Sequence, residues 1–378
     1  MNRIIYIDYL RNFANIIRCF IHASVPYMIT AAPMWPVDDK GSWFFDIIIF
    51  VNHLFVMELF FMISGFMFAM KLKRSTVPKI ILNRFKRIVL PFLLGLIVLV
   101  PIVLSLFSLS NHVGFSFLHF DILKQSYISG WVLGIENFFP IAHLWFLYYL
   151  IFFYIFTLLL KRIIFKIKVK SVFKLVLVGV SISSLCMLFM ERWIVENPLT
   201  LVPEIPSLVH FFVFFLIGCI SYNSPQLLDD VKRNVNFLLP LGFLFSLGAI
   251  VPQIWFENTD IEYYLLIKLG AILFSCSAIY LLVLGLWGYC SCLNLKDSKY
   301  LRYITDSSYW VYLSNMPIVV ILQIIIIPLS IPVLLKFLIV FFGAFTISMI
   351  TYEYFVRYTF IGSVLNKKRK RNLLKSII

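Results

Sequence analysis

The chain has 378 residues, of which 61% are hydrophobic and 13% are charged. Soluble globular domains are about 45–50% apolar and about 25% charged, so this composition excludes an ordinary water-soluble domain. The net charge of +15 does not indicate nucleic-acid binding, because the basic residues lie between long apolar runs, where they would face anionic lipid.

Apolar runs recur along the chain, and several approach the ~18–20 residues that cross a hydrocarbon core as a helix. Lipid offers free backbone groups no hydrogen-bond partners, so each run is expected to be helical. We predict an all-α, polytopic membrane protein of about ten transmembrane helices in a single domain, with a helical bundle at 7–357 and a basic tail at 358–378. The predicted spans are 10–29, 46–70, 88–107, 141–160, 171–190, 207–222, 236–252, 263–288, 309–329 and 332–356.

Lys and Arg concentrate in the segments 71–87 and 161–174 and in the tail, whereas the alternate loops carry most of the acidic residues. Basic segments stay on the cytoplasmic side of a membrane, so we predict that both termini are cytoplasmic. The six cysteines lie mostly inside spans, and their spacing indicates neither a disulfide framework nor a metal site.

The first span carries three ionisable residues, Arg11, Arg18 and His22. Arg11 and His22 are eleven positions apart, which places them on one helix face about 16 Å apart along the axis. Arg11 could hold an anionic carrier at the cytoplasmic mouth, and His22 could accept a proton from a hydroxyl. Alternatively, Arg11 is a positive-inside anchor, His22 a packing residue, and Arg18 a structural residue that reaches a carboxylate such as Glu58.

Glu58 lies inside the second span, where a carboxylate must be paired or protonated. Ser64 and Gly65 in the same span are expected to let helices approach closely. Arg84 and Arg87 stand three positions apart before the third span and could clamp a phosphorylated carrier, although a positive-inside flank gives the same pattern.

His143 and Trp145 open the fourth span at its outer end, where an aromatic belt is expected. Glu353 and Arg357 lie four positions apart near the end of the last span. That spacing predicts an ion pair within one helix.

These motifs, in this order, resemble the membrane-bound acyltransferase 3 family over nearly the whole chain. Arg11 and His22 are similar to the family's Arg-x10-His signature. Asn315 departs from the pattern, because the family usually has histidine there, and an amide cannot titrate. The residues that carry the resemblance are YIDYLR at 6–11, ELFFMISGF at 58–66, RFKRIVLP at 84–91, HLWFL at 143–147, YWVYLSNMP at 309–317 and YEYFVR at 352–357.

The resemblance implies a multi-pass protein of the bacterial cytoplasmic (inner) membrane that takes acetyl-CoA or succinyl-CoA as donor and holds no permanently bound cofactor. The acceptor would be a hydroxyl of an outer glycan, such as a periplasmic glucan, lipopolysaccharide or capsule; a weaker subgroup likeness is to the periplasmic-glucan succinyltransferases. The expected site residues are His22 and Glu58 for catalysis, Arg11, Arg84 and Arg87 for the donor phosphates, and Arg18, His143, Trp145 and Asn315 for the substrate.

Two other classes of protein stay open. A transporter or flippase of a lipid-linked saccharide would also be polytopic and basic on the inside, but the chain shows no internal repeat with matching broken helices. A non-enzymatic assembly or sensor protein would make the ordered motifs coincidental. If the protein is an enzyme, two routes are possible. The acceptor hydroxyl could attack the thioester directly, or the acyl group could pass through a transient acyl-enzyme.

Overall fold

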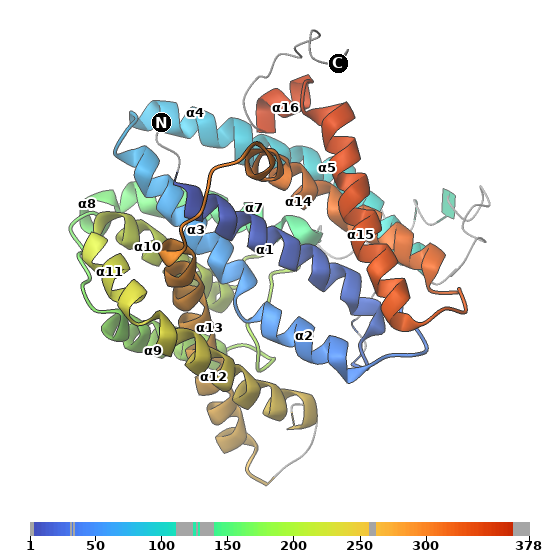
Figure 1. Ribbon diagram of the computed structural model, residues 1–378, viewed down its shortest axis with the longest axis horizontal. Coiled ribbons are helices and arrows are strands. Elements are labelled where there is room, and N and C mark those ends of the chain that lie inside the picture. Colours follow the sequence, from blue (N-terminus) through green and yellow to red (C-terminus); the bar gives the residue numbers. More distant parts are fainter. Residues whose placement is uncertain are drawn as a thin grey trace. The chain divides into compact units, whose positions relative to one another are not determined.

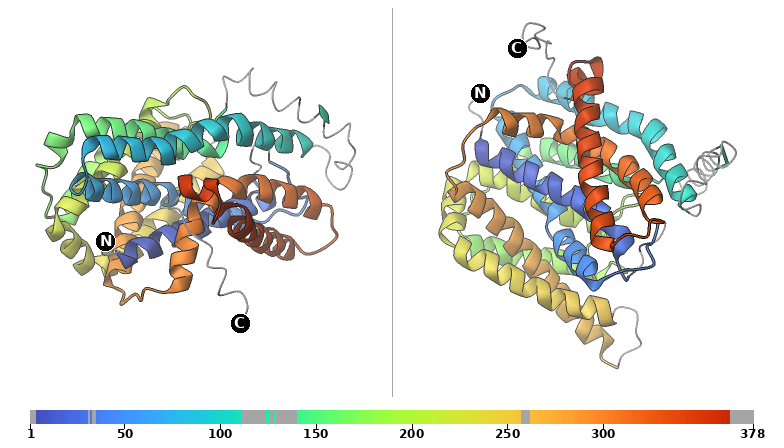
Figure 2. Two further views of the ribbon diagram at one scale, coloured as in Figure 1. Left: turned by 90° about the horizontal axis from the view of Figure 1, so that it is seen from above. Right: turned by 45° about the vertical axis from the view of Figure 1, so that its right-hand side comes forward.

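A computed structural model describes residues 4–30, 32, 35–110, 124–125, 128, 140–256 and 262–365, and within these ranges every regular element is a helix (Figures 1 and 2). The all-α prediction is therefore confirmed for the described chain. The helices form two compact units, which are described separately below. Unit 1 comprises 1–21, 46–80 and 148–297, and unit 2 comprises 22–45, 81–147 and 298–378.

Unit 1 is built around a close contact between α3 and α10. A Cβ atom at Gly65 of α3 would overlap the carbonyl oxygen of Phe215, and one at Gly218 of α10 would overlap that of Met62. The two backbones therefore touch, as expected for Gly65. The helices of this unit are most of α1 (Ile5–Ser24), most of α2 (Trp43–His53), α3 (Val56–Leu72), most of α7 (Trp145–Leu159), α8 (Lys161–Ile164), α9 (Val172–Leu188), α10 (Ile205–Asn223), α11 (Pro225–Arg233), α12 (Val235–Phe256) and α13 (Tyr264–Cys292).

Unit 2 contains the long pair α14 and α15, which pack side by side (Figure 2). The predicted ion pair near the chain's end is confirmed, since Arg357 Nη1 lies 2.7 Å from Glu353 Oε2. The elements of this unit are η1 (Val25–Tyr27), the end of α4 (Val77–Arg84), η2 (Phe85–Val89), α5 (Leu90–Leu109), η4 (Ala142–Leu144), α14 (Lys299–Ile326), α15 (Val333–Thr351), η5 (Tyr352–Val356) and α16 (Phe360–Leu365).

In the described ranges, eight helical segments are long and apolar enough to cross a membrane. They coincide with eight of the ten predicted spans. The other two predicted spans, 10–29 and 171–190, coincide with α1 and α9. α9 is apolar but only 17 residues long, and α1 carries Asp8, Arg11 and Arg18. The chain is thus a multi-pass membrane protein.

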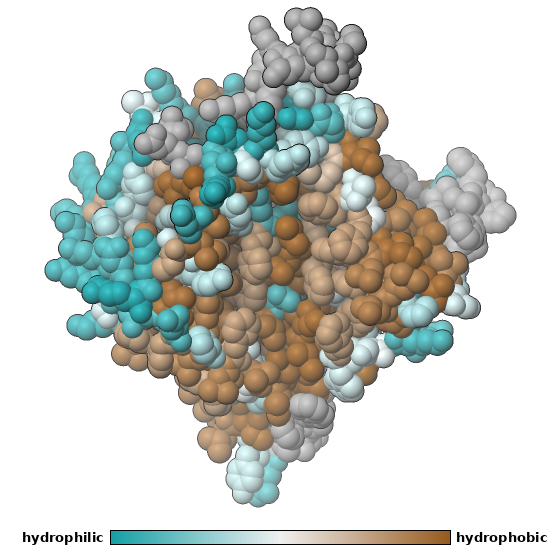
Figure 3. Space-filling model, in the orientation of Figure 1, coloured by the Kyte–Doolittle hydropathy of each residue, from teal (hydrophilic) through white to brown (hydrophobic). Residues whose placement is uncertain are grey.

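The basic segment 161–174 lies beside α11 in unit 1. The backbone N–H of Val169 donates to Ser224 Oγ at 3.3 Å, and that of Val172 donates to Asp230 Oδ2 at 2.7 Å. On the face drawn in Figure 3, hydrophilic residues gather over α8 and α11, and the side chains over α12 are mostly hydrophobic. One end of unit 1 is therefore polar and basic, while its flank is apolar.

Two predicted features fall largely outside the described residues. The stretch between the third and fourth spans includes 111–123 and 129–139, and the basic part of the tail begins at Lys367. The organisation as one bundle at 7–357 with a tail at 358–378, and the cytoplasmic placement of both termini, stay predictions.

Candidate functional site

α1 carries Arg11, Arg18 and His22 on one unbroken helix. No glycine or proline interrupts Ile5–Ser24, and the helix ends two residues before Pro26. Arg11 and His22 are half-buried and Arg18 is buried. The eleven-residue separation therefore corresponds to about 16 Å along one helix axis.

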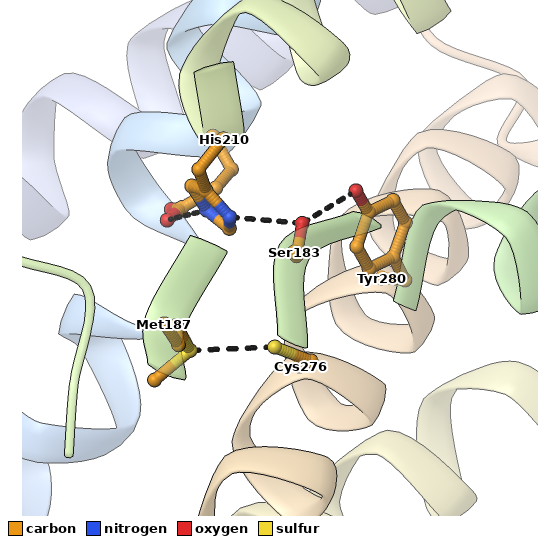
Figure 4. Close-up of polar contacts among 6 residues, drawn as sticks. Ser183, Met187, His210, Cys276 and Tyr280 are labelled. Carbon is orange, nitrogen blue, oxygen red and sulfur yellow. Dashed lines mark hydrogen bonds and ion pairs between the residues drawn. The ribbon is translucent and has the colours of Figure 1, made fainter. Parts of the chain in front are cut away.

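Glu58 belongs to a buried polar chain in unit 1, whose other members, His210, Ser183 and Tyr280, are labelled in Figure 4. Glu58 Oε1 lies 3.3 Å from His210 Nε2, and His210 Nδ1 lies 2.9 Å from Ser183 Oγ. Ser183 Oγ is in turn 2.8 Å from the Tyr280 hydroxyl. Each of the four residues is at most 1% exposed. Four helices, α3, α9, α10 and α13, thus meet at a single line of hydrogen bonds.

The pairing of Glu58 corrects one expectation. Arg18 does not reach Glu58; its Nη2 donates to Asn15 Oδ1 of its own helix at 3.1 Å, and His210 is the ion-pair partner of Glu58. His210 was not among the predicted site residues, although it lies inside the span 207–222. A histidine at membrane depth is the same signal that singled out His22.

Chemically, the chain from Glu58 to Tyr280 can share protons among a carboxyl group, an imidazole and two hydroxyls. Glu58 Oε2 has no hydrogen-bond partner among the described residues. The arrangement contains the residue types of a carboxylate, histidine and serine triad, but its serine is fully buried among helices. We therefore assign these contacts first to the packing of unit 1.

Arg84 and Arg87 lie where α4 passes into a π-helical stretch, η2. Both side chains are half-buried, and the Tyr309 hydroxyl donates to the carbonyl of Arg87 at 2.6 Å. Single π-helical turns are frequent at functional sites. The wider turn also changes the angle between the two arginines from that of a regular α-helix.

His143 lies against a break in the hydrogen bonding of α14. Pro317 has no N–H, so the carbonyl of Leu313 lacks its helical donor. His143 Nε2 lies 3.2 Å from that carbonyl oxygen, and because a carbonyl only accepts, Nε2 carries the proton. The Tyr312 hydroxyl donates to the His143 carbonyl at 2.6 Å. α14 thereby joins the His143 and Arg87 motifs within unit 2.

Asn315 is fully buried on α14, and neither its amide oxygen nor its amide nitrogen has a hydrogen-bond partner among the described residues. Such a group costs free energy unless a ligand or water satisfies it. Asn315 thus has the features of a side chain that binds a polar ligand.

Trp145, at the start of α7, is 7% exposed.

The surroundings of His22 come from three segments of unit 2. Its ring centroid lies 6.0 Å from that of Trp35, and Gln323 Nε2 of α14 donates to its backbone carbonyl at 2.8 Å. Trp35 also packs edge-on against Phe107 at 5.3 Å. Gln323 was not among the predicted site residues, and neither was Lys336, a buried lysine of α15 that pairs with Asp38.

The structure thus divides the predicted site residues between its units. Unit 1 holds Arg11, Arg18 and Glu58, and unit 2 holds His22, Arg84, Arg87, His143, Trp145 and Asn315. The described contacts join the motifs of Arg87, His143 and Asn315 through α14, and α1 joins Arg11 to His22.

Comparison with known proteins decides the family. Residues 4–353 match the family model of the acyltransferase domain, acyltransferase 3. The chain belongs to the acyltransferase 3 family. No curated protein and no solved structure matches it. Membership in acyltransferase 3 supports acyltransferase activity, in agreement with the resemblance of the sequence motifs.

Proposed function

We propose that this acyltransferase 3 protein transfers an acetyl or succinyl group from cytoplasmic acyl-CoA to a hydroxyl of an extracytoplasmic glycan, with His22 as the catalytic base. The observation that carries the proposal is the unbroken helix α1, which holds Arg11 and His22 on one face. A donor anchored at Arg11 would have to bring its thioester about 16 Å along the helix to reach His22.

The proposed reaction needs one group that accepts and then returns a proton. His22 removes the proton from the acceptor hydroxyl, whose oxygen attacks the thioester carbonyl. The carbon–sulfur bond then breaks, and the departing thiolate receives that proton from the His22 imidazolium. Histidine has an ordinary pKa of about 6.5, which suits both steps near neutral pH. A transient acyl-enzyme is the second route, and it would need a nucleophile besides His22.

Arg11, Arg84 and Arg87 would hold the phosphates of the donor. Guanidinium groups bind phosphate through paired hydrogen bonds, which favours arginine over lysine for this task. The basic segments at 71–87 and 161–174 support a donor site on the cytoplasmic side. In this proposal ten spans cross a bacterial inner membrane, with both termini in the cytoplasm.

The remaining predicted residues would bind the acyl group or the glycan. Asn315 would donate and accept hydrogen bonds, and His143 and Trp145 would line the acceptor side. A succinyl donor, as used by the periplasmic-glucan subgroup, needs a cation for its free carboxylate, and the buried guanidinium of Arg18 is our candidate. Glu58 would act in catalysis through its proton chain to His210.

The decisive experiment supplies purified protein in lipid nanodiscs with acetyl-CoA or succinyl-CoA and a glycan fraction, and measures both free CoA thiol and acylated glycan. We expect one donor to be consumed by the wild type and activity to fall by about a thousandfold or more in His22→Ala. His53→Ala, a half-buried histidine at the end of α2, serves as the matched control.

Full activity of a folded His22→Ala protein would contradict the catalytic assignment. Absence of turnover with both donors in the wild type would favour the transporter of a lipid-linked saccharide. That alternative is tested in the same nanodisc preparation by movement of a labelled lipid-linked sugar without CoA.

A further inference from the structure

The connection between α1 and α2 is held by a buried ion pair. Lys336 Nζ of α15 lies 2.6 Å from Asp38 Oδ2, and the two side chains are 7% and 2% exposed. The second carboxylate oxygen, Asp38 Oδ1, accepts the backbone N–H of Lys40 at 3.0 Å. Lys336 Nζ also donates to the carbonyl of Ile327 at 2.6 Å. The pair therefore joins three segments of unit 2.

The same connection is folded back on itself. The backbone N–H of Asp38 donates to the carbonyl of Pro26, and that of Ser42 to the carbonyl of Tyr27, each at 2.9 Å. Phe45 packs against Tyr27 at a ring distance of 5.5 Å and against Phe337, the neighbour of Lys336, at 5.4 Å. The described residues of the connection are thus fixed at both ends.

A buried ion pair carries a large desolvation free energy. Removing a carboxylate and an ammonium from water costs several kcal/mol per ion, and apolar side chains of similar volume often give equal stability. The pair does, however, set one arrangement that apolar packing would not specify. One position in this connection depends on that arrangement.

Trp35 is that position, because it precedes Asp38 by three residues and lies beside His22 at 6.0 Å. Trp35 packs against a buried cluster of α5 and α14 formed by Leu109, Val320 and Ile324. His22 itself is half-buried, and its Nδ1 atom is buried. The indole ring of Trp35 thus covers part of the His22 imidazole.

We propose that Asp38 and Lys336 are positioning residues that hold Trp35 against His22, and that Trp35 keeps water away from the acyl group during transfer. The inference rests on the proposed function of His22. If water replaced the glycan hydroxyl, its oxygen would attack the thioester, the carbon–sulfur bond would break, and a carboxylic acid and CoA thiol would form. Trp35 and its ion pair therefore favour transfer over hydrolysis.

The first test needs no activity. Diethyl pyrocarbonate carbethoxylates accessible histidines, and mass spectrometry gives the rate at His22 with His53 as an internal reference. We expect a several-fold faster rate at His22 in Asp38→Asn and in Trp35→Leu. Asp39→Asn, which changes the neighbouring exposed carboxylate, leaves the rate unchanged. Unchanged His22 rates in Trp35→Leu overturn the proposal, even if Asp38→Asn fails to fold.

The second test measures how the acyl group is partitioned. The ratio of free acid to acylated glycan is expected to rise roughly tenfold in Asp38→Asn and Trp35→Leu, with donor KM nearly unchanged. A purely structural role would lower all activity and leave this ratio as in the wild type, which overturns the proposal. A wild type that is inactive with both donors refutes the proposed function, whereas the carbethoxylation result still reports on the position of Trp35.

Discussion

At the scale of single residues, Pro317 explains the position of His143. The proline leaves the Leu313 carbonyl without a helical donor, and the imidazole supplies one from another helix. The sequence shows both residues, but 174 positions separate them, and nothing in the local pattern joins them. Substrate binding by His143 stays a prediction beside this structural contact.

This contact makes His143→Ala and Pro317→Ala non-additive. Alone, His143→Ala leaves a buried carbonyl unpaired, which is expected to cost about 1–3 kcal/mol of unfolding free energy. In the Pro317→Ala background a backbone N–H can bond Leu313, so the cost of His143→Ala should fall. Unfolding of the four proteins in detergent measures the cycle, and additive effects would contradict the hydrogen-bond assignment.

Asn315 provides a second prediction, because its amide is buried without a partner in the described chain. Asn315→Leu removes this cost and is expected to raise the unfolding free energy by about 1–2 kcal/mol. If the amide binds substrate, kcat/KM falls in the same variant. Tm and acyl transfer are measured together, and a fall in Tm would show that the amide has a structural partner.

At the scale of elements, the sequence predicted the existence of the helices better than their ends and contacts. The second span was predicted at 46–70, but Leu54 and Phe55 separate α2 from α3. The last turn before the third span is π-helical, which no residue pattern indicated. Hydrophobic length identifies a span, whereas its breaks depend on tertiary packing.

The close contact of α3 with α10 gives a prediction for a helix pair. Gly65→Ala places a methyl group against the Phe215 carbonyl, so α3 must move away from α10. We expect a loss of about 1–3 kcal/mol and a lower Tm. Gly270→Ala in α13 is the control, since a Cβ there meets no atom within 4 Å, and helix propensity favours alanine. Equal effects at both glycines would contradict the backbone contact.

At the scale of the whole molecule, the candidate site residues come from distant parts of the chain. Charges inside apolar spans identified Arg11, His22 and Glu58, because such charges are costly in lipid. Partners such as Ser183 and Tyr280 are ordinary helix residues whose role appears only when α9 and α13 meet α10. Their hydrogen bonds could not be predicted from the sequence, because these depend on which helices are neighbours.

α1 also belongs to both compact units, with its first seventeen residues in unit 1 and its last three in unit 2. In the proposed function, this helix sets the distance from a donor held at Arg11 to His22. The double substitution Asp8→Arg and Arg11→Asp moves the cation about one turn further from His22. It lengthens the separation along the helix axis to about 21 Å.

The exchanged protein should bind a CoA donor of unchanged length less well, with KM raised roughly tenfold and kcat changed much less. Arg11→Ala, measured in parallel, shows the effect of losing the cation altogether. If the exchanged variant kept the wild-type KM, the proposal that Arg11 anchors the donor would be contradicted. Residues other than Arg11 would then determine the size of the donor that the protein accepts.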